Sequence, residues 1–190
     1  TRDIYAAGAV QPGDEDDYFQ SSLFTIARRR ILWLLILVLA NGLTTKVIAM
    51  NDQILKEIVL LAAFIPLLIG TGGNVGAQSS TVVIRGLSTQ KLKSLGAVKA
   101  VFKEAITGAL LGVLMMLVVF PFAWWQGEGP LIASAVGISL ISITTLAATT
   151  GAILPLLFDK MRLDPALMSS PFITTVTDIA GVFIYLSTAK

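Results

Sequence analysis

Asp178 is the residue whose position in this sequence points most directly to chemistry. It lies in the middle of an apolar stretch near the end of the chain, with about half of the stretch on each side. If that stretch is a membrane helix, its carboxylate lies near mid-membrane, where a charge is costly unless it meets water, a cation or a partner. Every Lys and Arg lies at or outside the end of an apolar stretch, so a bound cation or proton explains Asp178 better than an ion pair. The alternative is a protonated Asp178 that is hydrogen-bonded between helices.

Oxygen-bearing residues accompany Asp178 on one face of the expected helix. Pro171, Thr174, Gly181 and Tyr185 recur around it at spacings of three and four, which predicts a single wet stripe. Pro171 cannot donate a backbone hydrogen bond, and its ring disturbs the carbonyl four residues earlier. Hydroxyl and carbonyl oxygens are hard ligands that suit Mg²⁺ or Ca²⁺. The alternative role for the threonines is hydrogen bonding between helices.

A polar, glycine-rich stretch over residues 70–80 is the second candidate. It is not a P-loop, because no Lys follows the glycines at the required offset, and Val75 occupies the last glycine position of G-x-G-x-x-G. Glycines inside a membrane span either allow close helix contact or expose backbone to a cavity. Asn74 and Gln78 lie one turn apart, and both offer amide oxygens. We therefore expect Asn74 in a cation pathway, with close packing as the alternative.

The composition places this chain in a membrane. Its 190 residues are 55% hydrophobic and only 14% charged, and the mean hydropathy is +0.80. Soluble domains carry roughly 25% charged residues, so both a soluble enzyme and a disordered chain are disfavoured. The sequence contains no His and no Cys, which excludes the usual zinc sites, disulfides and His- or Cys-based catalysis. We expect neither an enzyme nor a nucleic-acid partner.

Five apolar runs predict the elements that position the candidate residues. They cover residues 31–50, 53–84, 105–125, 131–158 and 166–189, and a span needs roughly 20 residues. The sequence thus predicts an all-α membrane protein, with a five-helix pore domain over residues 21–190 after a cytoplasmic linker over residues 1–20. Three small-x-x-x-small pairs predict close helix contacts: Gly108 with Gly112, Ala133 with Gly137, and Ala147 with Gly151.

Basic residues are concentrated on one side of the predicted membrane. They precede the first run, and they lie near the connection between the second and third runs and the connection between the fourth and fifth runs: Arg28, Arg29, Arg30, Arg85, Lys91, Lys93, Lys99, Lys103, Lys160 and Arg162. The opposite side carries Lys46, Lys56 and Lys190. The positive-inside rule then predicts a multi-pass protein of the inner (plasma) membrane, with a cytoplasmic N-terminus and an external C-terminus.

Two stretches of the sequence are specific enough to carry a family resemblance. Residues 66–80 read PLLIGTGGNVGAQSS, and residues 164–166 and 170–178 read DPA and SPFITTVTD. They resemble the second-span and fifth-span signatures of the MgtE family of magnesium channels, and the resemblance covers essentially the whole chain. It implies a homodimer in the lipid bilayer, with one pore between two subunits that is lined by the second and fifth spans of each.

The resemblance also implies a role for each candidate residue. Asp178 is implied to be the pore carboxylate that attracts hydrated Mg²⁺, Thr174 to offer its backbone carbonyl, and Asn74 to be a pore-facing amide. Mg²⁺ is then both the transported ion and a pore ligand. Cytoplasmic N and CBS domains are implied upstream, where they bind Mg²⁺ and close the pore, and the polar start without Met fits a piece of a longer protein. The acidic run from Asp14 through Glu15 and Asp16 to Asp17 is expected to be a solvated loop, with cation sensing as the alternative.

The sequence therefore predicts the pore domain of a magnesium channel. A secondary transporter that couples Mg²⁺ to H⁺ or Na⁺ would use the same carboxylate at Asp178, so the sequence leaves both mechanisms open. A membrane anchor without transport would leave that buried carboxylate unexplained. Selectivity also stays open, since Mn²⁺, Co²⁺ and Ca²⁺ accept oxygen ligands too.

Overall fold

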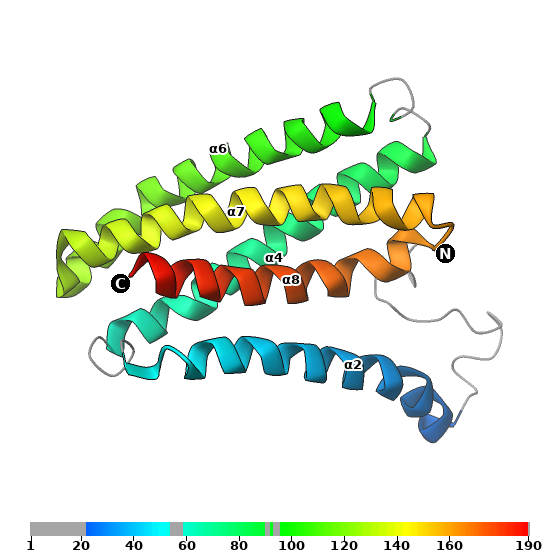
Figure 1. The fold of residues 1–190 in the computed structure, drawn as a ribbon, viewed down its shortest axis with the longest axis horizontal. Helices are drawn as coiled ribbons and strands as arrows, with labels where there is room; N and C mark the ends of the chain where they lie inside the picture. Colours follow the sequence, from blue (N-terminus) through cyan, green and yellow to red (C-terminus); the bar gives the residue numbers. More distant parts are fainter. Residues whose placement is uncertain (1–21, 54–58, 90–91, 93–95, 190) are drawn as a thin grey trace.

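The chain folds into a bundle of long helices (Figure 1). The computed structural model describes residues 22–53, 59–89, 92 and 96–189, so the linker over residues 1–20 and its acidic run lie outside the described residues. The described elements are α2 (Leu23–Ala49), α4 (Val59–Ser88), α6 (Ala97–Ala123), a π-helical turn η1 (Trp124–Glu128), α7 (Gly129–Lys160) and α8 (Pro165–Thr188). The expected all-α class is confirmed.

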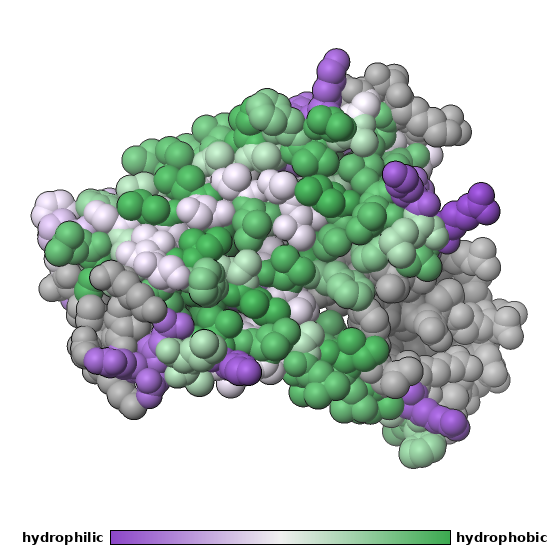
Figure 2. Space-filling model, in the orientation of Figure 1, coloured by the Kyte–Doolittle hydropathy of each residue, from purple (hydrophilic) through white to green (hydrophobic). Residues whose placement is uncertain are grey.

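Three segments of these helices are long and apolar enough to cross a membrane. They are Leu61–Ser88, Ala97–Gln126 and Gly129–Lys160. Two shorter apolar segments, Leu34–Ala49 in α2 and Phe172–Thr188 in α8, complete the set found among the described residues. Figure 2 shows a largely hydrophobic surface between the two ends of the bundle, as expected for a protein whose solvent is lipid.

The central helix of the bundle is α7. It packs against α4, α6 and α8, whereas α4 and α6 hardly touch each other although they follow one another among the long helices that the structure describes. In the apolar part of α7, 50% of the residues are buried, compared with 17% in the apolar part of α6. The core consequently surrounds α7, with α6 on its outer side and α2 alongside α8 (Figure 1).

Small residues let these helices approach closely. A methyl group added to Gly108 of α6 would stand 2.5 Å from the carbonyl oxygen of Thr144 in α7. Gly151 of α7 lies against the backbone of Gly76 in α4. Beside that contact, the hydroxyl of Ser79 donates a 2.8 Å hydrogen bond to a backbone carbonyl of α7. The close contacts predicted at Gly108 and Gly151 are therefore confirmed.

The contact at Gly151 leads to a stability prediction. Gly151→Ala should lower the free energy of unfolding by about 1–3 kcal/mol, because the new methyl group would overlap the carbonyl of Gly76 and force α4 and α7 apart. Thermal unfolding of the purified protein in detergent measures this effect. The matched control is Gly42→Ala in α2, where an added methyl group has no atom within 4 Å. Equal melting temperatures for the two variants would contradict the proposed α4–α7 contact.

Candidate functional site

Asp178 lies within α8, and its side chain is half-buried. Its carboxylate makes neither a hydrogen bond nor an ion pair with any residue that the structure describes. A protonated Asp178 held by hydrogen bonds between helices is therefore not what the described residues show. A carboxylate in this position is available to water or to a cation.

Thr174 lies one helical turn before Asp178 and is also half-buried. Its backbone carbonyl accepts a 2.9 Å hydrogen bond from the hydroxyl of Thr177, which also donates to the carbonyl of Ile173 at 2.8 Å. Thr177 is fully buried, and both hydrogen bonds of its hydroxyl stay within α8. An ion bound directly to the Thr174 carbonyl would compete with the hydroxyl of Thr177. This competition favours an ion that contacts the carbonyl through one of its own water molecules.

The glycine-rich stretch of α4 divides between two faces of the helix. Gly72 and Gly76 are buried, and a methyl group on either would clash with side chains of neighbouring helices. Gly70, Asn74 and Gln78 are exposed, and a methyl group on Gly70 would have no atom within 4 Å. Close packing therefore accounts for two of the glycines. The exposed face carries the two amides, and a cation pathway at Asn74 stays a prediction.

The structure brings α4 and α8 together at the level of the candidate residues. A methyl group built on Gly73 would lie 3.8 Å from Cγ2 of Thr174. Asn74 follows Gly73 directly, and Asp178 follows Thr174 by one turn. Asn74 and Thr174 thus lie at one level of the bundle, with Asp178 on the next turn of α8.

The wet stripe predicted along α8 does not extend beyond Asp178. Gly181 is buried, with an added methyl group only 3.6 Å from Ile143 of α7. Tyr185 is fully buried in the apolar cluster that contains Ile143 and Leu140. The prediction was wrong here because α7 covers this face over the second half of α8. The side chain of Pro171 lies outside the part of the chain that the structure describes.

Two residues of the open face of α4 were not singled out from the sequence. Pro66 and Gly70 are exposed in the same way as Asn74 and Gln78. These four recur at intervals of four residues, so helical spacing was the signal that could have found them. Pro66 has no N–H to donate, so the carbonyl of Ala62 one turn earlier lacks its helical hydrogen bond. Gly70 has no side chain to cover the backbone around it.

The site offers fewer protein ligands than a site that surrounds a metal ion completely. Among the described residues, no group of three or more His, Cys, Asp or Glu side chains could hold a metal. One carboxylate with neutral oxygens suits an ion that keeps most of its own water, as Mg²⁺ does. Softer metals would require thiolate or imidazole ligands, and this sequence contains neither Cys nor His.

Most described basic side chains gather at one end of the bundle. The start of α2, the end of α4, the start of α6 and the end of α7 all lie on the right in Figure 1. These regions carry Arg28, Arg85, Lys99, Lys103, Lys160 and Arg162, and Lys46 lies at the opposite end. This charge distribution distinguishes the two ends of the bundle.

Comparison with known proteins gives consistent matches. The family model MgtE, described as a divalent cation transporter, matches residues 65–188. Magnesium transporter MgtE of Thermus thermophilus is 36% identical over 190 residues, which are 100% of this chain and 42% of that protein. The proteins of the same name from Bacillus subtilis and Enterococcus faecalis are 34% and 35% identical over 92% and 86% of this chain, and 39% and 36% of their own lengths. The chain thus spans less than half the length of these relatives.

Proposed function

The chain belongs to the MgtE family of divalent cation transporters, and from this premise we propose that it forms the pore of a magnesium channel. Hydrated Mg²⁺ moves through this pore down its electrochemical gradient. The observation that carries the proposal is the carboxylate of Asp178, half-buried within an apolar helix and without a partner among the described residues. The relatives named magnesium transporter support Mg²⁺ as the ion.

The pore forms between two copies of the chain. Asn74 and its neighbours on the open face of α4 are exposed in a single subunit, and Thr174 and Asp178 remain partly exposed beside them. A two-fold axis next to this face gives two carboxylates, two amides and two carbonyls around one path. Two Asp178 carboxylates then match the charge of one Mg²⁺ without a cage of protein ligands.

The ligands hold the ion loosely enough to release it. Mg²⁺ gives up its water reluctantly, so the Asp178 carboxylates and Asn74 amides contact the water shell of the ion. The Thr174 carbonyl shares its lone pairs with the hydroxyl of Thr177, which weakens direct coordination further. Weak, replaceable contacts are what conduction requires, because the ion must leave as readily as it enters.

The pore is oriented with the basic end of the bundle in the cytoplasm. Arg85, Lys99, Lys103 and Lys160 all lie at this end, and positive charge is retained on the cytoplasmic side of inner membranes. The N-terminus is then cytoplasmic and the C-terminus external. Cytoplasmic N and CBS domains upstream regulate the opening of the pore in the full-length protein.

Flux into liposomes tests this function. Purified protein reconstituted around an Mg²⁺-sensitive dye should give rapid Mg²⁺ entry down an imposed gradient, and planar bilayers should show discrete current steps. Empty liposomes control for leak, and a Ca²⁺ gradient of the same size tests selectivity. Mg²⁺ entry should persist when a protonophore or a Na⁺ ionophore removes the corresponding gradient. Saturable entry that stops with either gradient would identify a coupled transporter and contradict a channel.

A further inference from the structure

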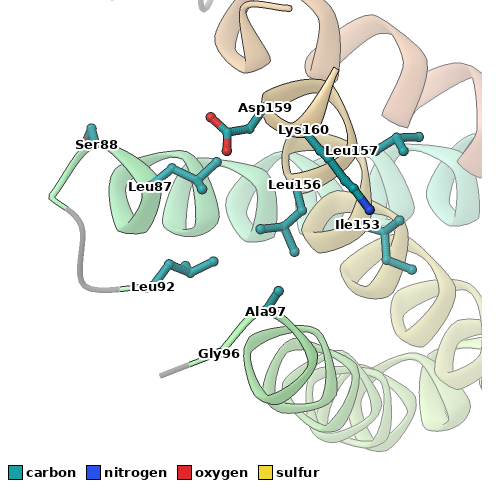
Figure 3. Close-up of a pocket in the computed structure, with 10 residues that line it drawn as sticks. All are labelled: Leu87, Ser88, Leu92, Gly96, Ala97, Ile153, Leu156, Leu157, Asp159 and Lys160. Carbon is teal, nitrogen blue, oxygen red and sulfur yellow. The ribbon is translucent and has the colours of Figure 1, made fainter. Parts of the chain in front are cut away.

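A hollow opens between α4, α6 and α7 at the basic end of the bundle (Figure 3). Its volume is about 740 Å³. Leu87, Leu92, Ile153, Leu156 and Leu157 form most of its apolar wall. Ile153 and Leu157 are 45% and 46% exposed, so the wall is open to whatever surrounds the bundle at this depth.

A charged side chain lies across this apolar wall. Lys160 is the last residue of α7, and in Figure 3 its ammonium group extends toward Ile153. The carboxylate of Asp159 points the other way, toward Leu87 and Ser88 of α4. Lys160 forms no ion pair with any residue in the described part of the chain. The hollow therefore combines an apolar surface with a lysine that makes no ion pair among the described residues, although the carboxylate of Asp159 lies at its other side.

The surroundings of the hollow add further positive charge. A smaller hollow of about 300 Å³ shares Leu92 with it and is lined by Arg85, Lys103 and Glu104. At this end of α4, α6 and α7, basic residues outnumber acidic ones: Arg85, Lys99, Lys103, Lys160 and Arg162 against Glu104, Asp159 and Asp164. The electrostatic balance thus favours an anionic ligand over a neutral one.

One class of molecule satisfies both the wall and the charge. A free anion such as phosphate would leave the leucine wall uncovered, and a zwitterionic lipid would bring a second cation to an end of the bundle that is already basic. An anionic phospholipid lays an acyl chain on the apolar wall and places its phosphate at the end of the membrane helices, where basic residues attract anionic headgroups. We propose that the hollow binds one anionic phospholipid of the adjacent leaflet, with Lys160 bound to its phosphate. This site does not depend on which ion the chain transports.

Native mass spectrometry of the detergent-solubilised protein tests the proposal directly. Wild-type protein should retain phosphatidylglycerol in preference to phosphatidylcholine, and inorganic phosphate should not displace it. Lys160→Ala should lower phosphatidylglycerol retention about fivefold, the contribution of one basic residue near a lipid surface, and Lys160→Arg should restore it. Leu156→Trp should also lower retention, because the larger side chain narrows the hollow at its apolar wall.

Matched variants elsewhere keep the test specific. Lys46→Ala removes a lysine at the opposite end of the bundle, and Leu117→Trp adds the same bulk to an exposed leucine of α6 outside the hollow. Both should retain phosphatidylglycerol as the wild type does. Equal retention of the two lipids, displacement by inorganic phosphate, or loss in the controls as large as in the hollow variants would each overturn the proposal. A change in oligomeric state in Leu156→Trp, with lipid retention unaltered, would assign the hollow to a second copy of the chain instead.

Discussion

Asp178→Asn is expected to lower Mg²⁺ flux through reconstituted protein by about a hundredfold or more. The substitution preserves the size of the side chain but removes a negative charge from each subunit, and the carboxylate is the group that attracts a divalent cation into an apolar surrounding. A dication a few ångströms from a carboxylate gains several kcal/mol even at an effective dielectric constant of about 20, so a hundredfold loss is a conservative expectation. Initial rates of dye response in liposomes measure it.

The matched control for Asp178 is Asp159→Asn at the end of α7, where the side chain is exposed. That variant should keep wild-type flux, because its charge lies outside the candidate pore. Asp178→Glu retains the charge and should keep part of the flux. Wild-type flux in a well-folded Asp178→Asn protein would show that this carboxylate is not the ion-attracting group.

Cysteine crosslinking is expected to separate the pore-facing residues from the lipid-facing ones almost completely. The chain contains no cysteine of its own, so each single substitution reports one position. Cysteine at Asn74 or Thr174 should form covalent dimers with mild oxidation or a short bifunctional reagent, since a two-fold pore brings each residue close to its copy. Dimer formation on non-reducing gels is the measurement.

The controls for crosslinking are Leu114 and Leu117 of α6, which are 51% and 66% exposed. They are more exposed than the half-buried Thr174, but they lie on a helix that covers the outside of α7. Cysteine at these positions should remain monomeric. Efficient crosslinking at Leu117 together with none at Asn74 would place the dimer axis on the α6 side and contradict the proposed pore.

The sequence predicted the helices better than it predicted their ends. Each of the five apolar runs corresponds to one long helix, because apolar length is what a bilayer requires. However, α6 begins at Ala97, well before the apolar run expected from residue 105. The helix continues through Lys99 and Lys103, since backbone hydrogen bonding does not stop where hydropathy does. Apolar runs predict which part of a helix lies in the membrane, but they do not predict the residues at which the helix begins and ends.

The candidate site was only partly predictable for a related reason. Helical spacing was enough to place Thr174 one turn from Asp178, because that relation is local. Whether Gly76 would pack or face a cavity depended on α7 and α8, which follow it far along the chain. The burial of Tyr185 depended on α7. Faces that a distant helix covers cannot be separated from open faces by periodicity alone.

The sparse contact between α4 and α6 has a consequence for the order in which the chain is made. During synthesis α4 and α6 leave the ribosome before α7, yet α7 is the helix that packs against both of them. Of the three segments long enough to cross a membrane, the one in α4 is the least apolar. In the nascent chain, the partners of Gly72, Gly76 and Ser79 in α7 are therefore missing until α7 has been synthesised. The contacts that join α4 and α6 into one bundle can thus form only after the chain has been synthesised through α7.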